Sequence, residues 1–298
     1  MSKKIVLSIA IFLFLLNVLC WQEVFTLSGG QKLVVGFLDV GQGDSAFIQT
    51  PEGHQILIDG GPGSTVLEKL SQLMPFWDKS LDVVILTHPE KDHMAGILEI
   101  LQKYKVDYFL WTGVVKNDAE NKKLATLLEK AQKSNNKFLA SLSEPGNTKI
   151  ITASAGQEIK AGSVLFNILY PLENLNGKEV KSTSNDSCLV SKITFGKSSF
   201  LFACDISSVA EKKLVSENID LQADVLKVAH HGSKYSTSDI FLSAVKPEVA
   251  VIEVGKNSYG HPTPETLQRL EKSGIKVLRT DKDGDVKFVS DGINIKIK

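Results

Sequence analysis

The sequence has no excess charge of either sign, because 34 Lys and Arg residues balance 34 Asp and Glu residues. Without an overall positive field, the chain has no general means of gathering nucleic acid or anionic lipid, so binding a polyanion requires a local site. Aromatic residues make up only 7% of the chain, which gives little support to a base-stacking surface. What remains is a chain of 298 residues, 43% of them hydrophobic, with ample apolar surface to fold as one large domain or two modest ones.

Cysteine is also scarce, and three residues in a chain of this length exclude a disulfide framework. Cys20 lies in an apolar segment near the amino terminus. Cys188 and Cys204 lie at similar distances from Gly196-Lys197, the expected turn of a β-hairpin. We expect both to be buried free thiols on adjacent strands, because hairpin strands are rarely bridged.

Only one long apolar run is present, from Ile5 to Trp21, and it follows Lys3 and Lys4. It is either the hydrophobic region of a signal peptide or a short transmembrane helix. No small-x-small cleavage pattern lies near its end, which favours an uncleaved anchor; cleavage, giving a secreted product, is the alternative. Because the basic side stays inside, residues 30 onward are expected outside the cytoplasm. We therefore predict a signal anchor or signal peptide over 1–29 and a folded domain over 30–298.

Strands and helices alternate through two similar halves of the domain, which predicts an α/β fold. Strands are expected over 32–38, 45–49, 55–58, 106–112, 138–141, 150–152, 164–170, 188–195, 198–203, 223–229, 248–254, 276–279, 286–290 and 293–297. Helices are expected over 64–74, 94–103, 118–134, 207–217, 238–245 and 264–273.

The stretch from Leu81 to Lys103 carries the first functional signal. An apolar, Val- and Ile-rich strand leads into a polar loop, and an amphipathic helix follows. The loop contains four metal-ligand side chains: His88, Glu90, Asp92 and His93. They can converge beyond the carboxyl end of the strand, where open α/β sheets place their sites.

Further residues of metal-ligand type end three other predicted strands. Asp205 follows one, His230 and His231 follow another, and His261 comes after a longer loop. Five of the six histidines thus lie in such loops, and His54 is expected to be a solvated turn residue.

Each of these residues also has an ordinary structural explanation. Asp92 and Asp205 are placed to cap the following helices, and His261 can be a hydrogen-bonded surface group. Lys234 can be a solvated loop lysine. Asp39 and Asp44 are expected to orient loops, with a place beside the ligands as the alternative. Taken together, the positions favour a metal centre.

These motifs resemble the metallo-β-lactamase superfamily. The resemblance lies in Thr87-His-Pro-Glu-Lys-Asp-His93, with Asp59-Gly-Gly as its first motif, Asp205 as the bridging aspartate and His230-His231-Gly-Ser as its final histidine motif. Within the superfamily, Phe37 to Ser45, Asn185-Asp-Ser and Tyr259-Gly-His-Pro resemble the extracytoplasmic domain of the ComEC/Rec2 competence family. The resemblance implies a metallo-β-lactamase αββα sandwich, two mixed sheets flanked by helices, with the metals at one edge of both sheets.

The resemblance also implies a ligand set. His88, Glu90 and Asp205 would hold one ion, while the other would be held by Asp92, His93, Asp205 and either His230 or His231. Glu90 departs from the family pattern, and no histidine occurs between His93 and His230, where Asn185 or Asp186 stands instead. The site is therefore expected to take one or two divalent ions, with Mn²⁺ credible beside Zn²⁺.

Such a site suits phosphodiester hydrolysis. Asp92, His230 and His231 are the predicted catalytic residues, and Ser233, Lys234, Thr237 and the non-ligating histidine are expected to contact the phosphate. By resemblance the substrate would be DNA, with the membrane and the DNA-uptake machinery as partners. One apolar segment cannot itself form a many-helix DNA channel. A cell-wall or headgroup phosphodiesterase and a non-catalytic binding module remain as alternatives, and the oligomeric state is left open.

Overall fold

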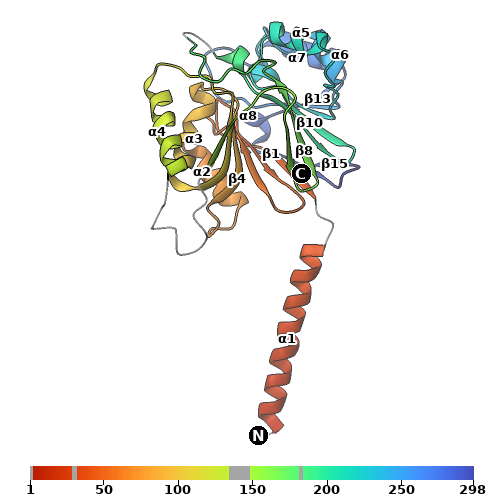
Figure 1. Ribbon diagram of the computed structural model, residues 1–298. Helices are drawn as coiled ribbons and strands as arrows, with labels where there is room; N and C mark the ends of the chain where they lie inside the picture. Colours follow the sequence, from red (N-terminus) through yellow and green to blue (C-terminus); the bar gives the residue numbers. More distant parts are fainter. Residues whose placement is uncertain (1–2, 29–31, 134–147, 181–183) are drawn as a thin grey trace.

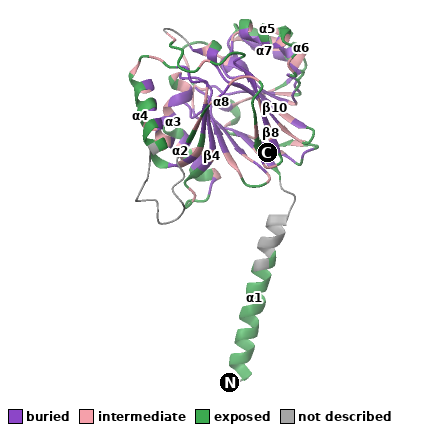
Figure 2. Ribbon diagram, in the orientation of Figure 1, coloured by how far each residue is buried: buried purple, intermediate pink, exposed green. Residues whose placement is uncertain are grey.

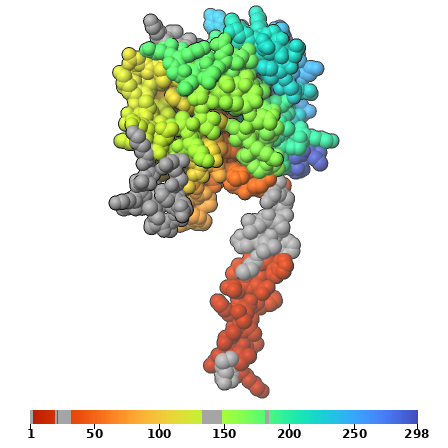
Figure 3. Space-filling view, viewed as in Figure 1, coloured from red at the N-terminus to blue at the C-terminus, as the bar shows by residue number. Residues whose placement is uncertain are grey.

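The computed structural model describes residues 3–28, 32–133, 148–180 and 184–298 of the chain (Figure 1). Its first element is helix α1 (Lys3–Ser28), and its described side chains, such as those of Leu7, Phe12 and Phe14, are exposed (Figure 2). In the space-filling view, the described atoms of α1 stand apart from the packed domain (Figure 3). Across the described residues, no helix combines the length and the apolar character needed to cross a bilayer, so the predicted transmembrane helix finds no support there.

Two β-sheets form the centre of the domain. The eight-stranded sheet has the order β15-β14-β1-β2-β3-β4-β5-β6, and the seven-stranded sheet has the order β13-β12-β11-β10-β9-β8-β7. The first comprises β1 (Leu33–Phe37), β2 (Ala46–Gln49), β3 (Gln55–Ile58), β4 (Ser80–Leu86), β5 (Lys105–Trp111), β6 (Lys149–Thr152), β14 (Val286–Ser290) and β15 (Ile295–Ile297). The second comprises β7 (Glu158–Ala161), β8 (Val164–Tyr170), β9 (Val190–Phe195), β10 (Ser198–Phe202), β11 (Val225–Lys227), β12 (Val249–Ile252) and β13 (Lys276–Arg279).

Helices cover the outer faces of both sheets, which gives the predicted αββα layering (Figure 1). The helices are α2 (Thr65–Leu73), α3 (Lys91–Lys103), α4 (Ala119–Lys133), α5 (Ser208–Ser216), α6 (Asp239–Val245), α7 (Pro264–Lys272) and α8 (Thr280–Asp283), with 3₁₀ turns η1 (Asn185–Ser187) and η2 (Ala229–Gly232). The apolar faces of α2, α3 and α4 pack on the first sheet, while α5, α6 and α7 pack on the second.

The alternation of side chains along each strand builds three apolar layers. In β10, Phe200 and Phe202 face the space between the sheets, whereas Leu201 faces the helices. The ring of Phe37 from the first sheet stacks on that of Phe202 from the second, with centroids 5.4 Å apart. These contacts hold the two sheets face to face.

Most predicted elements agree with the structure apart from their boundaries, but helix α8 and strand β7 were not predicted. The predicted strand over 138–141 lies outside the described residues. Strand β7 was not predicted, because it is an edge strand whose sequence Glu-Ile-Lys-Ala has only one buried residue. Helix α3 begins at Lys91, one turn earlier than predicted, so Asp92 and His93 lie in its first turn.

Strand direction brings the candidate ligands together. Strands β3 to β6 run parallel in the first sheet, and β10 to β13 run parallel in the second. The carboxyl ends of parallel strands share one edge of a sheet. The segments that follow β4, β10 and β11 therefore meet at one end of the sandwich.

Candidate metal centre

Four buried side chains converge at this end of the sandwich. Asp44 comes from the β1–β2 loop, His93 from the first turn of α3, Asp205 from the end of β10 and His231 from η2. One possible ligand atom of each lies within 4.8 Å of those of the other three. The set draws on both sheets.

The distances within the cluster match those of a coordination shell. Asp205 Oδ2 lies 3.4 Å from both His93 Nε2 and His231 Nε2. His231 Nε2 lies 3.3 Å from Asp92 Oδ2. Ligands about 2.0–2.1 Å from a tetrahedral cation are roughly 3.3–3.4 Å apart, so these atoms can share one ion. His93 Nε2 is also buried and makes no hydrogen bond, as expected of a nitrogen that is placed to bind a metal ion.

The outer nitrogen of each imidazole is held by a hydrogen bond. His93 Nδ1 donates to Asp59 Oδ2 at 2.8 Å, and His231 Nδ1 donates to the carbonyl of Glu253 at 2.8 Å. Asp59 is held in turn by the backbone N–H and hydroxyl of Thr87. These contacts leave Nε2 of both rings directed at the cluster, as is usual for metal-ligating histidines.

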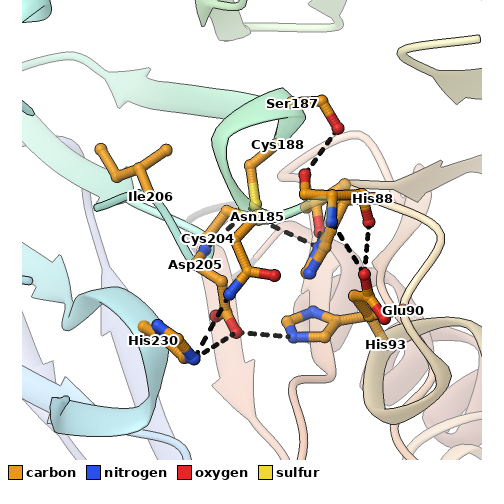
Figure 4. The surroundings of a disulfide bond; sticks show 12 residues. His88, Glu90, His93, Asn185, Ser187, Cys188, Cys204, Asp205, Ile206 and His230 are labelled. Carbon is orange, nitrogen blue, oxygen red and sulfur yellow. Dashed lines mark hydrogen bonds and ion pairs between the residues drawn. A yellow bond between two sulfur atoms is a disulfide. The ribbon is translucent and has the colours of Figure 1, made fainter. Parts of the chain in front are cut away.

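The structure distinguishes the two adjacent histidines. Both have left-handed backbone angles, with φ of 51° and 52°. His231 is buried in the cluster, whereas the side chain of His230 is 32% exposed and its Nε2 lies 3.9 Å from Asp205 Oδ2. His230 therefore lies at the rim of the centre, and Figure 4 shows its ring beside Asn185 and Asp205.

The charges of the cluster depend on one another. Burial disfavours the imidazolium form of His93, but Asp205, Asp44 and Asp59 outweigh it and raise its pKa well above the usual value. For His231, Asp205 and Asp44 likewise overcome burial and raise the pKa to about 10. Conversely, the two histidines and Lys227 overcome burial and lower the pKa of Asp205 well below its usual range. In the metal-free protein, the positive charges of the protonated histidines and of Lys227 offset the negative charges of the carboxylates.

Two residues of the predicted first metal position are placed differently. Glu90 turns out of the cluster: its carboxylate accepts hydrogen bonds from Lys116 Nζ at 2.8 and 2.9 Å and from the Ser184 backbone and hydroxyl at 2.9 and 2.8 Å. The ring of His88 packs 4.2 Å from that of His93, and its Nε2 is buried without a partner. Burial and His93 lower the pKa of His88 to about 3, so this ring is neutral.

The other predicted residues divide between the rim and the surrounding loops. Asn185 Nδ2 lies 3.3 Å from His230 Nε2, and the His261 ring lies 5.4 Å from that of His230. Lys234 instead lies over the ring of Tyr235, and Ser233 Oγ accepts a hydrogen bond from the Tyr235 backbone. Asn185, His230 and His261 thus form the rim, whereas the side chains of Ser233 and Lys234 contact Tyr235.

The expectation of two free thiols is wrong. Cys188 and Cys204 form a disulfide, with Cα atoms 6.1 Å apart (Figure 4). The last pair of the β9–β10 ladder is Ser191 with Phe202, so both cysteines lie outside the paired residues. The backbone spacing of paired strands, which disfavours a bridge, therefore does not apply to them. The bond lies against the centre, because the backbone N–H of Asp205 donates to Cys188 Sγ.

Sequence reasoning left one residue of the cluster open and missed another. For Asp44, a place beside the ligands was the alternative to orienting its loop, and the structure places it inside the cluster. Lys227 was not singled out, although its Nζ contacts the carboxylates of both Asp44 and Asp205. A lysine within the apolar run Val225-Leu-Lys-Val is the signal that could have revealed it.

Comparison with known proteins is consistent with this site. A family model described as "Metallo-beta-lactamase superfamily" matches residues 38–110. The "ComE operon protein 3" of Bacillus subtilis is 32% identical over 85% of this chain and 32% of its own length. The "Competence protein ComA" of Neisseria gonorrhoeae is 29% identical over 84% of this chain and 31% of its own length. The chain thus spans about a third of the curated relatives it matches.

Solved structures show the same fold at low sequence identity. The metallo-beta-lactamase fold protein YhfI from Bacillus subtilis has a TM-score of 0.54 at 16% identity, covering 87% of this chain and 100% of that protein. CmlA, a diiron β-hydroxylase from Streptomyces venezuelae, has a TM-score of 0.51 at 16% identity, covering 87% of this chain and 54% of that protein.

Proposed function

We propose that this chain is a metal-dependent phosphodiesterase acting on DNA. It has the metallo-β-lactamase fold and resembles competence proteins of the ComEC type over most of its length. The observation that carries the proposal is the group of His93, Asp205 and His231, in which Asp205 Oδ2 lies 3.4 Å from both imidazole Nε2 atoms. Asp92 Oδ2 adds a further oxygen 3.3 Å from His231 Nε2. Imidazole and carboxylate ligands suit Zn²⁺, and the share of oxygen ligands also admits Mn²⁺.

A bound divalent cation would polarise a phosphoryl oxygen and lower the pKa of water. The chain supplies the rest of the site. Asp59 and the Glu253 carbonyl hold the two ligand histidines in place. Asp92 is the ligand with the most exposed side chain, so substrate enters on its side.

The rim residue His230 suits contact with the substrate. Burial is the largest cause that lowers its pKa, so the ring is neutral at pH 7 and can donate a hydrogen bond. In the proposal, His230 binds a non-bridging phosphate oxygen, while Asn185 restricts the orientation of its ring.

DNA is proposed as the substrate because the similarity to competence proteins covers most of the chain. A headgroup or cell-wall phosphodiester is the second candidate. Either substrate can use Tyr259, which is 74% exposed and lies with its ring 5.9 Å from that of His261. An exposed aromatic ring at the rim can stack on a base or bind a quaternary ammonium group.

An extracytoplasmic position also belongs to the proposal. Its support is the sequence pattern of Lys3 and Lys4 ahead of the apolar run Ile5 to Trp21, which is typical of a signal peptide or an anchor. On this view the domain meets DNA outside the cytoplasm, beside the membrane and the uptake machinery.

Cleavage of labelled single-stranded and double-stranded DNA with Mn²⁺ or Zn²⁺ tests the function. We expect cleavage by the full chain and a loss of at least 100-fold in Asp92→Ala and Asp205→Ala. Asp220→Ala, which changes an exposed carboxylate paired with Lys192, is the matched control and should retain activity. Cleavage that survives both site variants would contradict the proposal, and a metal-bound protein that cleaves no DNA would favour the second substrate class.

A further inference from the structure

Lys227 is a lysine enclosed in the candidate metal centre. It is the last residue of β11, and its side chain is 2% exposed. Lysine is almost never buried to this extent unless it is paired. Here Nζ donates to the Asp44 carboxylate, to the Cys204 carbonyl at 3.1 Å and to Asp205 Oδ1 at 3.5 Å.

These three contacts determine what the ammonium can do. An ammonium group has three N–H donors, and each has an oxygen partner. None is left for a substrate, so Lys227 is not a phosphate-binding group or a proton donor. Its role is to place a fixed positive charge between Asp44 and Asp205.

The two carboxylate oxygens of Asp205 face different groups. Its Oδ2 faces His93 and His231, where the proposed metal ion would lie, while its Oδ1 faces Lys227. A carboxylate that bridges two metal ions likewise directs one oxygen to each. In this chain the second oxygen of Asp205 faces an ammonium.

The other residues of the predicted first metal position do not form a second site. Glu90 is bound by Lys116 and Ser184, and Asn185 contacts His230. Of the predicted first-position residues, His88 keeps an unpartnered nitrogen, and one imidazole does not make a metal site.

We propose that Lys227 permanently supplies the positive charge that a second metal ion would provide, so that this centre binds one metal ion. The inference rests on the proposed function, in that the centre must bind a metal.

The experiment measures Mn²⁺ per chain by equilibrium dialysis with mass spectrometry, and the electron paramagnetic resonance spectrum of the bound ion. It compares the full chain with Lys227→Met and with the control Lys192→Met. Lys192 is also a largely buried lysine of the same sheet, and it is paired with Asp220 on the surface. A double variant, Asp44→Asn with Lys227→Met, removes the ion pair as a unit.

We expect one equivalent and an isolated-ion spectrum for the full chain and for Lys192→Met. Lys227→Met should bind a second equivalent and show the broadening of a coupled pair, because Asp44 and Asp205 Oδ1 have lost their cation. The double variant should return to one equivalent.

Two equivalents in the full chain would overturn the inference and leave the proposed function standing. A folded Lys227→Met that stays at one equivalent would also overturn it. No bound metal in the full chain would refute the proposed function itself. If Lys227→Met does not fold, the count for the full chain still decides.

Discussion

Asp59 acts on the centre through a single hydrogen bond to His93, and a variant can test this. Asp59→Asn keeps the shape of the side chain but puts an amide where His93 Nδ1 and Thr87 donate. We expect metal affinity to fall roughly 10- to 100-fold, as for other residues that orient a metal ligand. A chelator competition titration measures the affinity.

The matched control for Asp59 is Asp82→Asn. Asp82 also accepts from a histidine, His54 Nδ1 at 3.0 Å, but on a partly exposed surface. Metal affinity should be unchanged in this variant. Equal losses in both variants would mean that Asp59 has no special role at the centre.

Metal binding should release protons from His93 and His231. The carboxylates raise the pKa of His93 well above its usual value and that of His231 to about 10, so both rings are protonated at pH 7 in the metal-free protein. A metal must displace these protons, so its affinity should rise with pH up to about 10, the pKa of His231, by up to tenfold per pH unit for each proton released. Calorimetry in buffers of different ionisation enthalpy counts the protons; a pH-independent affinity would contradict the raised pKa values of His93 and His231.

At the scale of elements, η2 holds the two histidines in left-handed conformations and continues into Gly232, with φ of 83°. A Cβ at Gly232 would lie 2.5 Å from Pro262 Cβ. Gly232→Ala should therefore combine a backbone cost of about 1–2 kcal/mol with a packing clash of about 1–3 kcal/mol.

Chemical denaturation compares this variant with Gly260→Ala. Gly260 has a similar φ of 76° but open space around its Cβ, so only the backbone cost applies. Gly232→Ala should be the less stable and should also bind metal more weakly, because η2 carries His231. Equal free energies of unfolding for the two variants would show that Pro262 can move away from the added Cβ without loss of stability.

The disulfide ties the segment before β9 to the end of β10, and hence to Asp205. It closes a loop with a sequence separation of 16, for which chain entropy predicts about 3 kcal/mol of stabilisation. Replacing Cys188 and Cys204 together by Ser should lower the free energy of unfolding by about 2–4 kcal/mol and weaken metal binding. Cys20→Ser is the control, and unchanged unfolding of the double variant would argue against a bridge.

At the scale of the whole molecule, the centre joins the two halves of the sandwich. His93 belongs to helix α3, which follows strand β4 of the first sheet, whereas Asp205 and His231 follow strands of the second. A bound ion therefore stabilises the packing of one sheet on the other. At a free metal concentration of 100 times Kd, the gain is about 2.7 kcal/mol.

Thermal unfolding with and without a chelator measures this stabilisation. We expect the chelator to lower the Tm of the full chain by several degrees and to leave that of Asp92→Ala unchanged. An equal fall in both would mean that the ion binds elsewhere.

The sequence by itself determined the layers and most residues of the candidate metal centre. Apolar periodicity sets which face of each strand or helix is buried, and residues such as Phe200 and Leu201 then follow the two-residue repeat. Asp92, His93 and Asp205 were also within reach, because parallel strands bring their carboxyl ends to one edge.

Only the tertiary structure decided which side chains meet there. It placed His231 inside and His230 at the rim, turned Glu90 to Lys116, and put Lys227 between Asp44 and Asp205. Local pattern encodes backbone conformation and burial, but these partners lie on different strands and loops. Their contacts form only after the two sheets have packed. Which pairs form depends on which oppositely charged side chains then lie next to one another in the buried site.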